Sequence, residues 1–251
     1  MALLAVIALA VMGVGGYRVY KHWFPPVPPS PVQEIRAAAS AARAVTSASA
    51  TFTTQVSGLT VMFGTIRQQT SPTRVATVSM TSVDGAERFA VTEVVTLSNV
   101  YVTMPSLAAA TGKPWLAVPV ARLGADPAMT QLYQTGVLPT AETALVGTAS
   151  TVRLAGTATV RGVPVSRYVG TIDPATALAA FGAQSRELLA PELTAVTGSI
   201  HFTAWIDAKH HLRKIETSAI VGGRRTVTTV LVTAFNRRMH IDVPDSSQVA
   251  S

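Results

Sequence analysis

The sequence predicts an α+β fold with one large antiparallel sheet. Apolar residues alternate with period two through most of the chain, and many of these positions are Val or Thr. Short turn sequences separate the alternating runs, and helical periodicity occurs in a few segments between them. Of the 251 residues, 48% are hydrophobic and 13% are charged, which indicates one folded domain with a substantial core.

The N-terminal residues 1–24 are predicted to form a membrane anchor or signal-like segment. The first 16 residues carry no charged side chain, and the next eight, YRVYKHWF, mix aromatic and cationic side chains as a headgroup interface favours. A membrane span needs about 20 apolar residues, a length that this segment reaches when its interfacial residues are counted. An uncleaved anchor, a signal peptide cut after Ala10 and a longer leader whose basic start is missing remain as alternatives.

A proline-rich linker, residues 25–31, follows this segment. Its sequence PPVPPSP favours a stiff polyproline II spacer of about 3.1 Å per residue, which would hold the domain away from a bilayer. Charge alone argues for a cytoplasmic domain, because Arg18 and Lys21 follow the apolar run and the positive-inside rule would keep them in the cytoplasm. The folded domain is predicted over residues 32–249.

The first half of the domain is predicted to be a helix followed by a strand meander. Residues 31–49 begin with Pro and contain an Ala-rich run, which favours an amphipathic helix with Val32, Ile35, Ala39 and Ala42 on its apolar side. Ser71-Pro72 and Asp84-Gly85 provide turns between the strands that follow. Strands are expected around residues 52–56, 78–80, 89–97, 101–104 and 115–118.

The last two of these strands are joined by residues 105–114, which we expect to form a connection at the rim of the sheet. Trp115 follows directly and is expected to anchor the connection against an apolar interior or to line the entrance to it.

The second half repeats the pattern of strands with helical connections. A helix is expected from Asp126-Pro127 to Gly136, with another near Glu142, and a helical connection from Asp173-Pro174 to Val196 that is interrupted by Pro191. Arg161-Gly162 and Gly222-Gly223 predict tight hairpins. The expected strands are residues 152–160, residues 163–173 and the four final runs SIHFTAWID, LRKIETSAIV, RRTVTTVLVTAFN and MHIDV, so that the chain has about eleven strands in all.

Several classes of function are excluded or disfavoured by composition and motifs. The chain has no Cys, which excludes disulfides, thiolate metal sites and Cys nucleophiles. The net charge is +7, but the arginines are scattered singly among the strands, whereas nucleic-acid sites cluster basic and stacking aromatic residues. No nucleophile elbow, metalloprotease motif or phosphate-binding glycine loop is present. We therefore expect no enzymatic activity, no cofactor and no nucleic-acid partner.

Two polar features of the sequence are candidate sites. His210 and His211 lie beside Asp207, but neighbouring strand residues point to opposite faces, so a shared metal ion is not expected unless the turn bends them together. Glu93 interrupts the apolar positions of residues 89–97. Three interpretations of it remain open: it marks the mouth of a cavity, it lies at a solvated strand end, or it forms an ion pair with a neighbouring arginine.

Several strands are apolar on both faces, so both sides of the sheet must be covered. A curved sheet wrapped around helices encloses a concave apolar interior, and periodicity does not distinguish a packed core from a lipid-sized pocket. Eleven residues are the candidates to line such a pocket: Val78, Met80, Phe89, Val91, Met104, Trp115, Leu116, Tyr168, Phe181, Leu189 and Phe202.

Four segments carry a resemblance to a known family: VYVTMPSLAAATGKPWLAVPV, VRGVPVSRYVGTIDPATAL, AWIDAKHHLRKIE and FNRRMHIDVPDSSQV. In order and spacing they resemble actinobacterial envelope lipoproteins of the LppX and LprG type, within the LolA-like superfamily, over about residues 32–249. The resemblance implies a half-open, many-stranded antiparallel barrel whose concave face is closed by helices around an apolar cavity. It also implies export and the binding of lipid or glycolipid acyl chains.

The resemblance leads to a functional hypothesis. We expect a membrane-tethered lipid or lipoglycan carrier on the extracytoplasmic side, with residues 1–24 replacing the lipid anchor because the acylated Cys of the lipoproteins is absent. The helical residues 181–196, broken by Pro191, are a candidate gate. The alternative is a tethered sensor or protein-interaction domain whose cavity is filled by side chains.

Overall fold

A computed structural model describes residues 29–123, 143, 145–180, 186, 190 and 193–250. The chain divides into Met1–Ser30 and a compact unit, Pro31–Ser251, and the architecture below is that of the second unit. Among the described helices, none combines the length and the apolar composition needed to cross a bilayer. The anchor expected from residues 1–24 lies outside the described residues.

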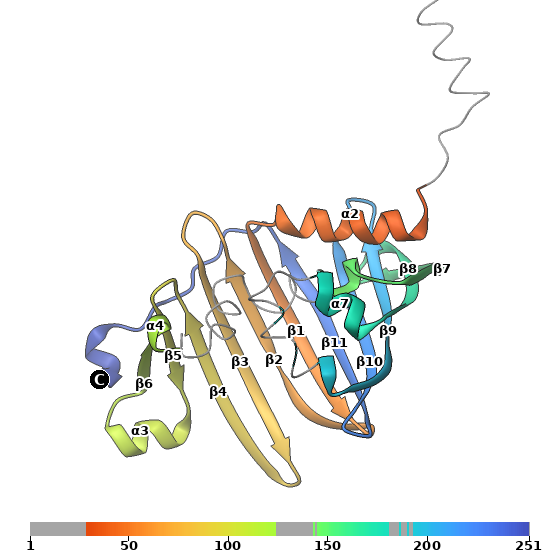
Figure 1. Cartoon of the computed structure of the whole chain (residues 1–251). Coiled ribbons are helices and arrows are strands. Elements are labelled where there is room, and N and C mark those ends of the chain that lie inside the picture. The colour runs from red at the N-terminus through yellow and green to blue at the C-terminus, as the bar shows by residue number, and fades with distance from the viewer. Residues whose placement is uncertain are drawn as a thin grey trace, which may run out of the picture. The chain divides into compact units, whose positions relative to one another are not determined.

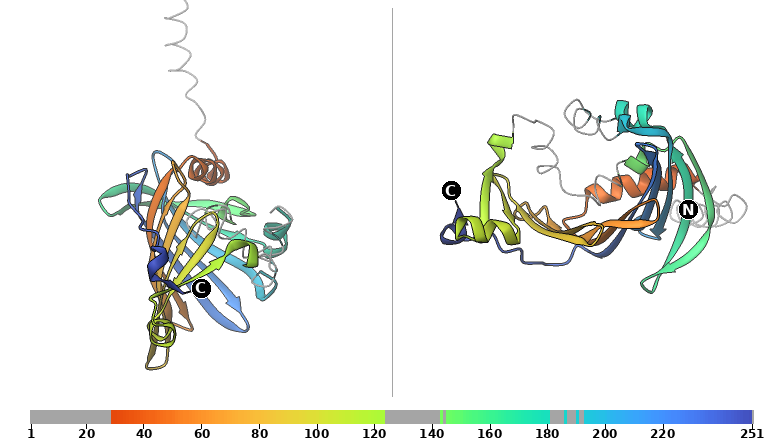
Figure 2. Two further views of the ribbon diagram at one scale, coloured as in Figure 1. Left: turned by 90° about the vertical axis from the view of Figure 1, so that its left-hand side faces the viewer. Right: turned by 90° about the horizontal axis from the view of Figure 1, so that it is seen from below.

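The unit is built on one 12-stranded sheet with the order β12-β6-β5-β4-β3-β2-β1-β11-β10-β9-β8-β7. The strand pairs are antiparallel except β12 with β6, and the sheet curves into an open trough (Figures 1 and 2). The strands are β1 (Ser47–Val56), β2 (Leu59–Gln69), β3 (Val75–Asp84), β4 (Glu87–Val95), β5 (Asn99–Thr103), β6 (Trp115–Pro119), β7 (Thr151–Val160), β8 (Val163–Ile172), β9 (Val196–Asp207), β10 (Leu212–Val221), β11 (Arg224–Phe235) and β12 (Val249–Ala250). The predicted α+β fold with a large curved antiparallel sheet is confirmed.

Helices lie on the concave side and at the ends of this sheet. They are α2 (Pro31–Arg43), α3 (Pro105–Thr111), α4 (Val120–Leu123), α7 (Pro174–Ala180) and the 3-10 helix η1 (Ser246–Gln248). Helix α2 buries Ile35 and Ala38 and crosses one end of the trough (Figure 2). The Asp173 carboxylate accepts a 2.7 Å hydrogen bond from the N–H of Thr176, so it caps α7 as predicted.

The tight turns follow the turn residues of the sequence. Arg161 and Gly162 have φ values of 49° and 78° between β7 and β8, and Gly222 and Gly223 have 55° and 77° between β10 and β11. Two successive positive φ values twist a hairpin in the same sense as its strands. Both predicted hairpins are confirmed.

Two predictions, near β1 and at the C-terminus, were wrong, and one strand was missed. Helix α2 ends at Arg43, and Ser47 already begins β1, where pairing with β2 and β11 outweighs the helical preference of the alanines. The strand β2 was not foreseen, because its apolar and polar residues do not alternate regularly. The MHIDV run is not a strand. Instead it belongs to a segment that runs along the convex side of the sheet, where the carbonyl of His240 accepts a 2.9 Å hydrogen bond from Arg67 (Figure 2).

The connection between β5 and β6 contains an unforeseen helix, α3. Pro105 stands at its first position, where the missing N–H costs nothing, and Gly112 ends it with φ 69°. The C-terminal segment returns to this corner, where Lys113 donates to the carbonyl of Ser247 and β12 pairs with β6. Val196, expected in a helical connection, begins strand β9. The helix expected over residues 126–136, Glu142 and Pro191 lie outside the described residues.

Candidate functional site

The concave face of the sheet carries an apolar row that crosses nine strands. Directly paired residues of neighbouring strands project to the same face, so the strand register identifies its members. At its centre Ile215, Val230 and Phe52 are buried, whereas Met80 and Val91 are only half-buried. In strand order from β7 the row is Leu154, Tyr168, Ala204, Ile215, Val230, Phe52, Gly64, Met80 and Val91.

A second row lies on the same face, two residues further along each strand toward the end of the sheet that α2 crosses. It runs from Val232 on β11 to Leu116 on β6 and holds the buried residues Ile66 and Val78. Glu93 belongs to this row, between Val78 of β3 and Val102 of β5, and is half-buried. The row places a carboxylate on an otherwise apolar surface. Its members are Val232, Ala50, Ile66, Val78, Glu93, Val102 and Leu116.

Two aromatic rings shape the concave face by lying over glycines of the next strand. A Cβ added to Gly170 would lie 2.7 Å from ring atoms of Phe202, and one added to Gly64 would lie 2.8 Å from the ring of Phe52. Each glycine therefore makes the space that its aromatic neighbour occupies. Because the ring covers a glycine that has no side chain of its own, the concave surface stays apolar across the strand that carries the glycine.

The convex face is different in composition. Its central row crosses five strands with hydroxyl side chains, and the Thr92 hydroxyl donates to the Ser79 hydroxyl at 3.1 Å. This contrast indicates that the concave face, rather than the convex face, offers an apolar surface to a ligand. The hydroxyl row is Thr51, Thr65, Ser79, Thr92 and Thr103.

The structure brings together most of the site residues that were predicted from the sequence. Those that share the concave face are Val78, Met80, Phe89, Val91, Leu116, Tyr168 and Phe202. Met104 precedes α3 and is 37% exposed. Trp115 alternates with Leu116 and so projects to the convex side, away from the interior that it was expected to contact. Phe181 and Leu189 lie outside the described residues.

Phe52, Ile215 and Val230 are concave-face residues that the site prediction did not include. Each stands at an apolar position of an alternating run, which is the available signal. Alternation alone does not say which of the two faces is concave. The register across β10, β11 and β1 shows that the three residues share one face, and the curvature of the sheet makes that face the concave one (Figure 2).

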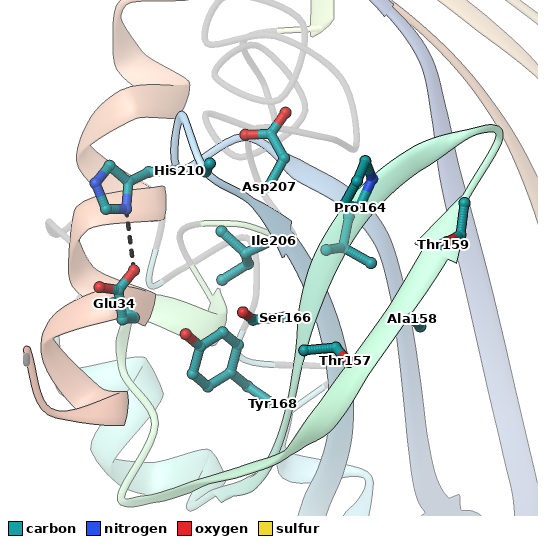
Figure 3. Close-up of a pocket in the computed structure, with 12 residues that line it drawn as sticks. Glu34, Thr157, Ala158, Thr159, Pro164, Ser166, Tyr168, Ile206, Asp207 and His210 are labelled. Carbon is teal, nitrogen blue, oxygen red and sulfur yellow. Dashed lines mark hydrogen bonds and ion pairs between the residues drawn. The ribbon is translucent and has the colours of Figure 1, made fainter.

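A pocket of about 730 Å³ opens between the first turn of α2, the β7–β8 hairpin and the β9–β10 turn (Figure 3). Tyr168 and Ile206 form part of its apolar wall, and the hydroxyl of Ser166 and the carboxylate of Glu34 form part of its polar wall. Burial raises the pKa of Tyr168, the hydrogen bond with Ser166 lowers it, and the charge of Glu34 raises it, so that the pKa of this phenol lies above its ordinary value. The mixed walls can hold the polar part of an amphipathic molecule.

Asp207 stabilises the β9–β10 turn beside this pocket. It accepts 2.9 Å hydrogen bonds from the N–H groups of Lys209 and His211, and 2.7 Å contacts from the Arg213 guanidinium. Burial raises the pKa of Asp207, but the hydrogen bonds from His211, Arg213 and Lys209 outweigh it and lower the pKa below its ordinary value. A carboxylate with this many partners is suited to fixing a turn.

The two histidines are held by different partners. His210 Nδ1 lies 3.1 Å from Glu34 of α2 (Figure 3), whereas the His211 ring stacks on Phe235 with ring centres 4.8 Å apart. The turn does not bring both rings to one point. Within the described part of the chain, no group of three or more acidic, His or Cys side chains is placed to hold a metal ion.

Comparison with known proteins finds the same fold in solved structures. No family model matches the sequence, and no curated protein matches it. LprF from Mycobacterium bovis superimposes with a TM-score of 0.56 and 16% sequence identity, covering 86% of this chain and 99% of that chain. The Mycobacterium tuberculosis lipoprotein LppX does so with a TM-score of 0.52 and 18% identity, covering 86% and 100%. The fold expected from the resemblance is therefore confirmed.

Proposed function

We propose that this protein binds lipids in the cell envelope and holds their acyl chains against the concave face of its sheet. The observation that carries the proposal is the apolar row across nine strands, which is buried at β10, β11 and β1 and half-buried at Met80 and Val91. The half-buried part offers apolar surface that a ligand chain can remove from water. Phe89, which is 53% exposed, lies near the start of β4 and extends this surface toward the end of the sheet opposite α2.

Burial of methylene groups provides enough free energy without any chemical step. Each CH₂ transferred from water gains about 0.8 kcal/mol, so an acyl chain with ten buried methylenes gains roughly 8 kcal/mol before the cost of ordering it. Two or three chains give tight binding. The eleven predicted residues remain the proposed ligand contacts, except that the position of Trp115 on the convex side argues against that residue.

The shared fold supports an envelope role, since LppX is a lipoprotein. We propose that residues 1–24 tether the domain to the membrane in place of a lipid anchor, because the chain has no Cys to acylate. Two positive charges, Arg18 and Lys21, are a weak orientation signal, so we propose that the domain lies on the extracytoplasmic side, as the resemblance to exported lipoproteins implies, and passes lipid or lipoglycan to or from the bilayer.

Mass spectrometry of lipid that copurifies with the full chain tests the proposal. Val91→Asp places a carboxylate on the concave row, and Ala90→Asp, one residue earlier on β4, places the same group on the convex face. We expect wild type and Ala90→Asp to carry acyl lipid in molar amounts, and Val91→Asp to lose most of it at unchanged circular dichroism. Lipid-free wild-type protein would favour the alternative of a sensor or protein-interaction domain.

Topology has a separate test, because the chain has no Cys. Ala86→Cys introduces one thiol in the exposed β3–β4 turn. Labelling by a membrane-impermeant reagent in intact cells is expected, and labelling only after lysis would contradict an extracytoplasmic domain.

A further inference from the structure

The end of the sheet that α2 crosses is rich in cationic side chains. Strands β1, β3, β8 and β10 begin at this end, and the β2–β3, β7–β8 and β9–β10 connections turn there (Figure 1). Two of the cations belong to the exposed side of α2, three lie in the turns, and two lie on β8 and β10 beside Trp205 of β9. They are Arg36, Arg43, Arg74, Arg161, Lys209, Arg167 and Lys214, which we call the basic end.

The carboxylates near α2 and the β9–β10 turn offset only part of this charge, because two of the three pair with residues outside the basic end. Glu34 pairs with His210, and Asp207 with Arg213 at 2.7 Å. Glu216 lies 3.8 Å from the Lys214 ammonium, a long and exposed contact. The basic end thus keeps a positive excess among the described residues.

An aromatic side chain stands within the basic end on the convex face. Trp205 of β9 pairs in register with Arg167 of β8 and with Lys214 of β10, and the Lys214 ammonium lies 4.4 Å from its ring centre. Trp flanked by cations is the combination that suits the headgroup layer of a membrane.

The chain also enters the folded unit at this end. Helix α2 begins at Pro31, and Glu34 in its first turn contacts the pocket formed by the β7–β8 hairpin. If residues 25–31 adopt the polyproline II form that their sequence favours, at about 3.1 Å per residue, they would span only about 20 Å. An anchor in residues 1–24 would therefore keep the basic end closer to the bilayer than the opposite end.

We propose that the basic end docks on the surface of a bilayer that contains anionic phospholipid. This proposal rests on the membrane tether of the proposed function for its geometry, and on the charges for its chemistry. Each Lys or Arg near an anionic membrane changes the binding constant about fivefold. In the docked state the opposite end, where Leu59 and Phe89 are 74% and 53% exposed, points away from the bilayer.

Fluorescence energy transfer on the full chain in vesicles tests the docking. Ser40→Cys places a donor on the exposed side of α2, and Ala86→Cys places it in the β3–β4 turn at the opposite end. The acceptor is a headgroup-labelled lipid, in vesicles of phosphatidylcholine alone or with about 30% phosphatidylglycerol. We expect transfer from Ser40→Cys to rise in the anionic vesicles and to fall at about 0.5 M NaCl, with no such change for Ala86→Cys.

Charge variants give the magnitude. Arg36→Gln with Arg43→Gln is expected to lower the ratio of docked to undocked domains about 25-fold, whereas Arg224→Gln with Arg225→Gln at the opposite end leaves it unchanged. Equal transfer in neutral and anionic vesicles, or higher transfer from Ala86→Cys, would overturn the proposal. Whether the chain stays on the vesicles at high salt tests the tether separately. If salt releases the chain, the tether fails, and energy transfer at low salt from Ser40→Cys compared with Ala86→Cys still tests whether the basic end binds the bilayer.

Discussion

Adding one methyl group at Gly170 tests the shape of the concave face. The new Cβ would lie 2.1 Å from the carbonyl oxygen of Thr151 on β7 and 2.7 Å from two ring atoms of Phe202. The carbonyl belongs to the sheet backbone, and the ring is buried, so neither can move away cheaply. Overpacking of this kind costs about 1 to 3 kcal/mol, and we expect Gly170→Ala to fall at the upper end.

Differential scanning calorimetry measures the effect as a change in Tm. A loss of about 3 kcal/mol lowers the Tm of a domain of this size by roughly 6 to 12 °C. Gly162→Ala is the matched control, because no atom lies within 4 Å of its added Cβ and only its φ of 78° opposes the change. That strain costs about 1 to 2 kcal/mol. A Gly170→Ala protein that melts with wild type, or above Gly162→Ala, would refute the packing of Phe202 over Gly170.

The remaining predictions concern two of the titratable residues that line the pocket, Asp207 and Tyr168, and one residue of the concave row. Asp207→Asn should lower Tm at neutral pH. Because the folded pKa of Asp207 is lowered, its contribution is present above the unfolded pKa and lost as pH falls through the folded pKa, so the Tm difference between wild type and variant should shrink in acid. The pKa of Tyr168 is raised, so its phenol ionises at a higher pH than free tyrosine, and Tyr168→Phe should remove that high-pH step from an absorbance titration. An unchanged titration curve would contradict this. Met80→Ala deletes three side-chain atoms from the half-buried row and should weaken acyl-probe binding by about 2 kcal/mol, or roughly 30-fold, whereas Thr81→Ala on the convex face should not.

Turn chemistry and alternation allowed much of the sheet to be predicted. Gly222-Gly223 predicts a hairpin because glycine takes positive φ without cost, and β10 and β11 pair as that turn requires. The Asp173 cap of α7 follows from local chemistry in the same way. Such features depend on a few neighbouring residues.

Features that depend on distant pairing were missed. Trp115 alternates correctly with Leu116, but only the register of β6 with β5 shows that Leu116 faces the interior and Trp115 does not. Strand β2 is held by β1 and β3 on both sides, so pairing maintains it despite an irregular pattern. The role of Gly64 and Gly170 as gaps for aromatic rings of other strands is likewise not visible in one dimension.

Photo-crosslinking tests most directly whether acyl chains lie against the concave face. The full chain is irradiated with a lipid that carries a diazirine in its acyl chain, and the modified residues are located by mass spectrometry. Adducts are predicted at Met80, Val91 and Val102, and should disappear when unlabelled lipid competes. Adducts that fall instead on the convex neighbours Ser79 and Thr92, or none that competition removes, would contradict the account.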